Sequence, residues 1–273
     1  MVEPLLPPTR VGPKGGRREK HPRRRIVDAI FHVVRTGCAW RQLPKDFPPW
    51  PTVYWYFTWW HDDGTGERVH DALRDRVRET DGRNAEPSTG LIDSQSIRTA
   101  DTVPAATRGF DAGKKVKGRK RFLVTDTLGQ LIAVHVVAAS VQDRDGARAL
   151  LWARLDHPQI QKYWADQGFA GRLVDRTAQV LGRELDIVRK DPGQRGFQAQ
   201  PKRWAIERTF SWLTAHRRLA RVYEAIPARS ETVIRWAMIG IMVRRLTAAD
   251  RRRGRARTRS YAPQPDKLGD SAE

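Results

Sequence analysis

The feature that most constrains this chain is an alternation of strand and helix signals between residues 83 and 221. The β-rich apolar runs that predict strands are 89–93, 121–126, 131–138, 160–166 and 185–188. Amphipathic segments that predict helices lie at about 143–155, 172–181 and 202–221. Gly129 lies between the second and third runs, where it favours a hairpin. This order of elements predicts a mixed α/β domain.

The chain before residue 83 reads as helical instead. Apolar residues at helical spacing predict helices at about 26–37, 52–61 and 69–77. Five of the ten tryptophans lie between Trp40 and Trp60, and we interpret them as the core of a small helical domain. The alternative is a helix-turn-helix-like module whose exposed aromatic rings touch DNA.

Three segments follow from these patterns. Residues 1–82 form a small all-helical domain, and residues 83–248 form the α/β domain, which closes with a helix at about 230–246. Residues 249–273 are rich in arginine, proline and polar residues and have almost no apolar content. That composition predicts a disordered basic tail.

The positive charge of the chain is concentrated in blocks. The formal net charge is +20, and the blocks at 10–25, 108–121 and 244–259 contribute +7, +6 and +7 of it. Blocks of this kind are typical of surfaces or arms that follow nucleic-acid phosphates, although the two terminal blocks could be solubilising tails. The longest near-continuous apolar run, 131–141, is about half of the ~20 residues that span a membrane. We therefore expect a nucleic-acid partner in the cytoplasm and no membrane partner.

Composition and motifs exclude several kinds of active site. The single cysteine, Cys38, excludes an internal disulfide and a cysteine-based zinc site. The sequence has no Walker loop, no Rossmann glycine fingerprint, no serine nucleophile elbow and no His-Glu-x-x-His pair. What remains is carboxylate chemistry.

Three carboxylates stand at places where such chemistry is expected. Asp93 and Asp166 each end a predicted strand, and Glu207 lies on the amphipathic helix that follows. Strand ends are where open α/β sheets collect ligands, and Mg²⁺ prefers oxygen ligands. Two such ions held ~3.5–4 Å apart can activate a water molecule or a 3′-hydroxyl against a phosphodiester.

Each of these carboxylates also has an ordinary structural interpretation. Asp93 could cap a turn, Asp166 could begin a loop, and Glu207 could pair with Arg203 four residues earlier on a solvated helix face. Other acidic residues compete for the same roles, namely Asp126, Asp143 and Asp145.

Several short motifs resemble those of bacterial insertion-sequence transposases of the DDE superfamily, in the group of insertion-sequence families four and five. The motifs, in chain order, are GCAWRQLP at 37–44, FPPW at 47–50, GFDAGKKVKGRKR at 109–121, DTLG at 126–129 and the segment 204–219 with its ERTFSWL core. The resemblance covers about residues 3 to 224. Because several motifs occur in the same order, the match is specific.

The resemblance implies an RNase H-like catalytic domain at 83–248, with a mixed five-stranded sheet and flanking helices, after a helical DNA-binding domain at 1–82. It places the catalytic, metal-binding carboxylates on Asp93, Asp166 and Glu207, with Mg²⁺ or Mn²⁺ as cofactor. Relatives carry a Tyr-Arg-Glu-Lys helix pattern, in which Arg203 and Glu207 match while Gln200 and Thr214 depart from it.

The activity implied is that of a transposase that cuts the ends of its own element and joins the 3′ ends to target DNA. The partners are then double-stranded DNA and further copies of the chain on that DNA, and the location is the bacterial cytoplasm with its nucleoid. The alternative is an inactive or truncated relic that binds the ends only as a repressor.

The basic segment 114–121 is expected to be a flexible loop that tracks DNA phosphates, because its cations alternate with Gly113 and Gly118. Neutralising its first three lysines should then lower the salt dependence of DNA binding. The residues that we expect to contact DNA are Lys114, Lys115, Lys117, Arg119, Lys120, Arg121, Arg203, Arg217 and Arg218.

Overall fold

The computed structural model describes residues 1–8, 19–152, 157–188 and 201–260. Its helices are α1 Arg23–Thr36, α2 Trp50–Asp62, α3 Thr65–Thr80, α4 Asp143–Trp152, α5 Arg172–Leu181, α6 Pro201–Thr214 and α7 Pro227–Ser260. Its strands are β1 Thr89–Arg98, β2 Gly109–Asp111, β3 Val116–Thr125, β4 Leu131–Ala138, β5 Lys162–Ala165 and β6 Glu184–Ile187. Short 3₁₀ turns lie at Glu3–Leu5, Trp40–Gln42, Ala105–Thr107, Gln167–Phe169 and Arg217–Leu219.

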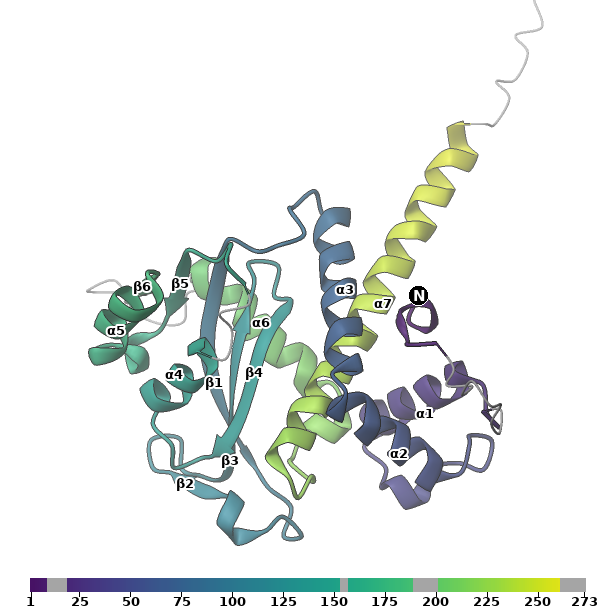
Figure 1. Cartoon of the computed structure of the whole chain (residues 1–273), viewed down its shortest axis with the longest axis horizontal. Helices are drawn as coiled ribbons and strands as arrows, with labels where there is room; N and C mark the ends of the chain where they lie inside the picture. Colours follow the sequence, from purple (N-terminus) through teal and green to yellow (C-terminus); the bar gives the residue numbers. More distant parts are fainter. Residues whose placement is uncertain (9–18, 153–156, 189–200, 261–273) are drawn as a thin grey trace, which may run out of the picture.

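The strands form one mixed sheet (Figure 1). Strand β3 lies antiparallel to β1, β2 and β4, whereas β5 runs parallel to β1 and β6 runs parallel to β5. The α/β class is thereby confirmed. The sheet has six strands rather than the expected five, because the short strand β2 pairs with the first residues of β3, where a loop was predicted.

Alternation along the strands sends apolar side chains to two separate cores. Leu91 and Leu123 belong to a core that includes α6 and α7, whereas Ile92 and Phe122 face a second core that includes α4 and α5. Helices therefore cover both faces of the sheet (Figure 1). This placement puts α6 directly over one face of the central strand β1, which it contacts.

The N-terminal helices do not have a core of their own. Apolar side chains of α1, α2 and α3 pack in the same cluster as α7 and one face of the sheet. Helix α1 ends at Gly37, whose φ of 74° is a conformation that glycine adopts without strain. The division at residue 82 stays a prediction about segments of the chain, and the packing is continuous across it.

The C-terminal segment differs from the prediction of a disordered tail beginning at residue 249. Helix α7 extends well beyond the expected end near residue 246 and continues to Ser260, so the first part of that segment is helical. Residues 261–273 lie outside the described residues. Among the helices that the structure describes, none is long and apolar enough to cross a membrane.

Candidate active site

The two predicted aspartates lie on neighbouring parallel strands or directly after them. Asp166 follows β5 as predicted, whereas Asp93 lies inside β1, which continues to Arg98 instead of ending at residue 93. Ile92 of β1 is the register partner of Ala165 of β5, so Asp93 and Asp166 leave the pair at the same level. Helix α6 contacts both strands from one face of the sheet and carries Glu207. The local fold therefore brings the three predicted carboxylates to one place.

A single arginine nitrogen lies among these carboxylates. Nη2 of Arg203 is 3.7 Å from Oδ2 of Asp93, 3.7 Å from Oδ2 of Asp166 and 3.5 Å from Oε1 of Glu207. Because both Oδ2 atoms lie 3.7 Å from the same nitrogen, Oδ2 of Asp93 and Oδ2 of Asp166 are at most twice that distance apart. The pairing of Glu207 with Arg203, considered from the sequence as an alternative to a metal site, is thus present together with the cluster.

Asp93 is the most deeply placed of the three acids, with its side chain 13% exposed. Burial raises the pKa of Asp93 to about 6, and the charge of Asp166 adds to the rise. The backbone N–H of Ser94, which donates to Oδ1 of Asp93 over 2.7 Å, acts in the opposite direction, as do Arg203 and Lys114. Burial and the neighbouring acid outweigh these groups, so the charged form of Asp93 is disfavoured relative to a free carboxylate.

The donor chemistry of the site fits a hard divalent cation, because carboxylate oxygens are the ligands that Mg²⁺ and Mn²⁺ take in proteins. In this structure the position between the three carboxylates is taken by Nη2 of Arg203. Among the residues that the structure describes, no three acidic, histidine or cysteine side chains are close enough to hold one ion.

A fourth acid lies beside the cluster. Asp143, in the first turn of α4, accepts from the Ser94 hydroxyl over 2.8 Å and pairs with Lys120 over 3.0 Å. A Cβ added to Gly168 would lie 3.1 Å from Oδ2 of Asp143 and 3.1 Å from Oδ1 of Asp166, so both acids lie close to this glycine.

The other two competing acids lie apart from the cluster. Asp126 is fully buried in an ion pair with Arg78, and its carboxylate also accepts backbone N–H groups of its own turn. Asp145 is exposed on α4. Asp143 was one of the competitors expected from the sequence, but only its contact with Ser94 in the middle of β1 distinguishes it from Asp145.

Four of the nine residues predicted to contact DNA remain exposed: Lys114, Lys115, Lys117 and Arg217. Lys114 also reaches the site, since its Nζ donates to the backbone oxygen of Ser94 over 3.1 Å. Arg203 is occupied with the carboxylates described above. Gln200, the departure noted from the family helix pattern, lies outside the described residues.

The other four are buried and paired, namely Arg119, Lys120, Arg121 and Arg218. The prediction that these side chains contact DNA directly is contradicted by their burial in this conformation. Arg119 donates to backbone oxygens of Thr107, Glu224 and Ala225. Lys120 pairs with Asp111 and Asp143. Arg121 donates to the side chain of Gln95, and burial lowers its pKa to about 9. Arg218 pairs with Glu224 over 2.8 Å.

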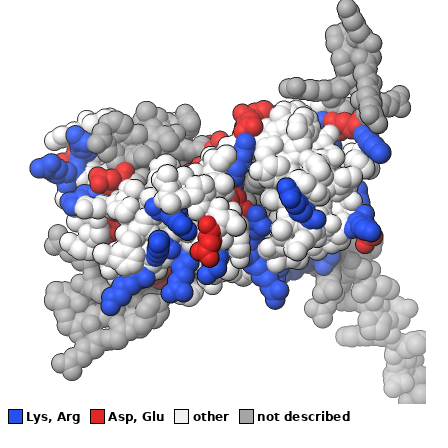
Figure 2. All heavy atoms as spheres, turned by 90° about the horizontal axis from the view of Figure 1, so that it is seen from below, with Lys and Arg blue, Asp and Glu red and all other residues white. Residues whose placement is uncertain are grey.

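The reason is that the predicted loop is mostly strand. Only residues 112–115 form a turn, in which Lys115 has a φ of 53°, and β3 begins at Val116. Strand β3 is central in the sheet, with β1 along one edge and β2 and β4 along the other, and its two faces pack against the two cores. Figure 2 shows that basic side chains nevertheless outnumber acidic ones on the face seen from below.

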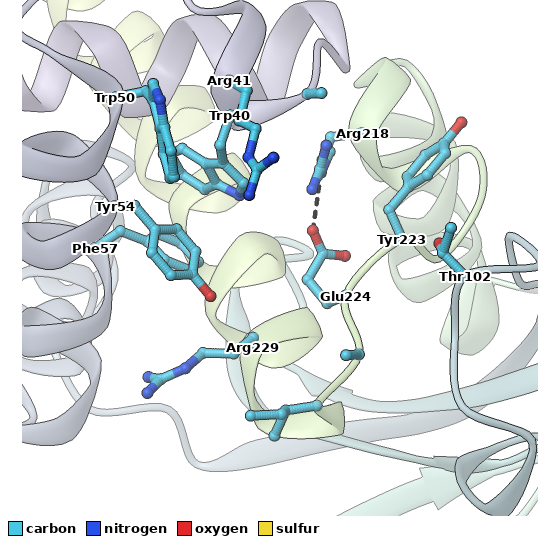
Figure 3. A pocket seen from close by; sticks show the side chains of 13 residues that line it. Trp40, Arg41, Trp50, Tyr54, Phe57, Thr102, Arg218, Tyr223, Glu224 and Arg229 are labelled. Carbon is cyan, nitrogen blue, oxygen red and sulfur yellow. Dashed lines mark hydrogen bonds and ion pairs between the residues drawn. The ribbon is translucent and has the colours of Figure 1, made fainter.

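A separate hollow of about 480 Å³ lies between the N-terminal helices and the segment that leads into α7 (Figure 3). One wall is aromatic and consists of Trp40, Trp50, Tyr54 and Phe57. The other lining residues are Arg41, Arg218, Arg229, Tyr223, Glu224, Ala39, Thr102, Ala225 and Ile226. In the hollow Glu224 is paired with Arg218, whereas Arg41 lies over the Trp50 ring at 5.5 Å and is exposed.

Comparison with known proteins gives two family matches. Residues 84–240 match the family described as "Transposase DDE domain", and residues 1–70 match the family described as "Putative transposase of IS4/5 family". A relative from Burkholderia cepacia, "Insertion element IS402 uncharacterized 16.2 kDa protein", is 34% identical over 106 residues, which cover 36% of this chain and 67% of the relative. No solved structure matches.

Proposed function

The chain belongs to the DDE transposases of the IS4/5 type, and from this premise we propose that it cuts the ends of its own insertion sequence and joins the freed 3′ ends to target DNA. Its α/β domain is accordingly RNase H-like. The observation that carries the proposal is the convergence of Asp93, Asp166 and Glu207 on one nitrogen of Arg203. An ordinary surface would disperse three like charges.

The roles follow from where each acid is anchored. Asp93 and Asp166 project from two hydrogen-bonded parallel strands, so they form a rigid pair that would hold divalent ions, with Glu207 completing the ligand set from α6. Bound Mg²⁺ or Mn²⁺ would lower the pKa of the nucleophile and offset charge on the phosphoryl oxygens. Water is the nucleophile in the cutting step and the freed 3′-hydroxyl in the joining step, with no covalent bond to the protein.

The exposed cations supply the surface for DNA. Lys114, Lys115 and Lys117 are on or beside the β2–β3 turn, and the Lys114 ammonium already reaches the strand that carries Asp93. A duplex held by this turn therefore passes the carboxylates. Contacts of this kind are to phosphates and position DNA without reading its sequence.

We infer that the aromatic hollow adds a second contact with DNA. Aromatic rings suit unpaired bases, such as those at an opened element end, and exposed guanidinium groups such as Arg41 suit the phosphates beside them. The hollow also joins the N-terminal helices to the segment after α6, so a duplex bound there would span both segments of the chain. The same proposal places the protein in the cytoplasm, where it acts on nucleoid DNA. It expects at least two copies of the chain on that DNA.

The experiment is cleavage of duplexes that contain the ends of the element in which the gene lies, with Mg²⁺ present. Asp93→Asn keeps the shape of the side chain but removes its charge, so cleavage is expected to be lost while DNA binding stays. Wild-type protein that binds these ends without nicking them would contradict the proposal and support the alternative, an inactive relic that represses other copies.

A further inference from the structure

Arg203 has an unusual position for a residue expected to hold DNA. Its Nη2 atom is almost equally far, at 3.5 to 3.7 Å, from an oxygen of each of three acids. Charge-assisted hydrogen bonds are shorter, at about 2.7–2.9 Å, so the guanidinium is not committed to any one of them. It acts as a counter-charge that the three carboxylates share.

The arginine nitrogen lies between the three acids, at the place that an ion shared by them would take. The described acids are not close enough to one another to hold a metal, and the guanidinium lies between them. Its side chain is 23% exposed, so it can leave toward solvent without unfolding α6. One positive charge among three negative ones leaves the cluster with an excess of two, which still attracts cations.

We propose that Arg203 is the resident counter-cation of the metal-free site, that it competes with divalent ions there, and that it is exchanged for a DNA phosphate when those ions bind. This proposal rests on the proposed function, because it takes Asp93, Asp166 and Glu207 as the metal ligands. The exchange implies that bound divalent ions raise the affinity for DNA and that bound DNA raises the affinity for these ions.

The direction of the exchange follows from the chemistry of the groups. A guanidinium matches the oxygens of a phosphate as well as those of a carboxylate, so DNA gives Arg203 an alternative partner of equal quality. Divalent ions in turn take the carboxylates and repel the arginine. By thermodynamic linkage, each ligand then raises the affinity for the other by the same factor.

The first measurement is binding of Mn²⁺ alone to DNA-free protein, by titration calorimetry. Arg203→Gln removes the competing charge and is expected to bind Mn²⁺ on the order of ten-fold more tightly than wild type, a factor worth about 1.4 kcal/mol. Arg203→Lys keeps the charge but not the planar fork and should fall between the two. Arg176→Gln removes an exposed charge on α5, away from the cluster, and should match wild type.

Thermal unfolding of the metal-free variants gives a second measurement that does not depend on catalysis. Arg203→Gln leaves three carboxylates without their counter-charge, so its Tm should fall below that of wild type and should rise more than that of wild type when Mn²⁺ is added. Equal Mn²⁺ affinity in wild type and Arg203→Gln, both folded by circular dichroism, would overturn the proposal.

The DNA half is tested with a labelled duplex of arbitrary sequence, by fluorescence anisotropy with and without Mn²⁺. The ion should strengthen binding more in wild type and Arg176→Gln than in Arg203→Gln. An equal effect in all three would overturn the exchange. Asp93→Asn in the Arg203→Gln background separates the two proposals: if Mn²⁺ binding there is unchanged, the carboxylate metal site itself is wrong.

Discussion

Arg119 and Lys117 are two residues apart in the predicted DNA loop, yet the structure gives them opposite surroundings. The side chain of Arg119 is 1% exposed and donates to Thr107 O over 3.0 Å, Glu224 O over 2.8 Å and Ala225 O over 2.6 Å. These bonds tie the central strand β3 to the segment that enters α7. Lys117 is exposed.

Arg119→Met keeps much of the apolar stem and removes every donor. Hydrogen bonds to a charged group are worth about 1.5–3 kcal/mol each, and the freed carbonyls can regain only part of this from water, so we expect a loss of about 3–5 kcal/mol. At about 2–4 °C per kcal/mol for a chain of this size, Tm should fall by at least about 6 °C. Differential scanning fluorimetry measures this change.

Lys117→Gln should leave stability unchanged and instead weaken DNA binding. Its Tm should stay within the equivalent of about 0.5 kcal/mol, because the side chain is on the surface. The slope of log K for DNA binding against log salt should fall by roughly 0.9 for each phosphate that the protein no longer neutralises, and further if Lys114 and Lys115 are also changed. The reasoning is refuted if Arg119→Met leaves Tm unchanged and instead lowers the salt slope.

Further expectations concern stability and the hollow. Gly118→Ala would place a Cβ 1.9 Å from the Ile97 carbonyl oxygen across the sheet, so urea denaturation should show a loss of about 3 kcal/mol or more. The pKa of Asp111 is lowered to about 2, against the effect of its burial, by hydrogen bonds and a nearby ammonium. Its contribution, roughly 2 kcal/mol, is present above pH about 4 and is lost as the pH falls toward 2; Asp111→Asn should flatten Tm against pH in that window. Tyr54→Leu should weaken the binding of single-stranded DNA about ten-fold by anisotropy, in line with base–aromatic stacking of about 1–3 kcal/mol, whereas Trp55→Leu, outside the hollow, should not.

Periodicity was enough to predict most of the strands because its signal is local, but it missed β2 and the first part of β3. Leu91 and Ile92 read as a buried strand from their own neighbours, and they do divide between the two cores. The strand-end position of Asp166 was predictable for the same reason, since the end of a run is visible in the sequence. That of Asp93 was wrong, because β1 continues through polar residues to Arg98. That Asp93 and Asp166 meet required only that their strands be neighbours.

The fate of the basic residues could not be predicted in this way. Glycines among lysines and arginines are typical of a solvated loop, and nothing local marks Arg119 as buried. Its partners Thr107 and Glu224 are 12 and 105 positions away, so its burial depends on tertiary contacts. The extension of α7 to Ser260 was missed because low apolar content was read as disorder, although arginine and alanine are good helix formers.

The core that α1, α2 and α3 share with α7 and the sheet bears on how this protein handles a stiff substrate. Helices packed in one apolar cluster with the sheet cannot swing against the carboxylates without exposing that cluster to water. The distance between the N-terminal helices, which we propose to bind DNA, and the carboxylates, which we propose to cut it, is therefore fixed. Any adjustment needed to bring a scissile phosphate to Asp93 must be made by the duplex, at a bending cost of order 1–6 kcal/mol for a site of 20–30 base pairs. Flexible steps near an element end would then be cut more readily than stiff ones, even where no side chain reads a base.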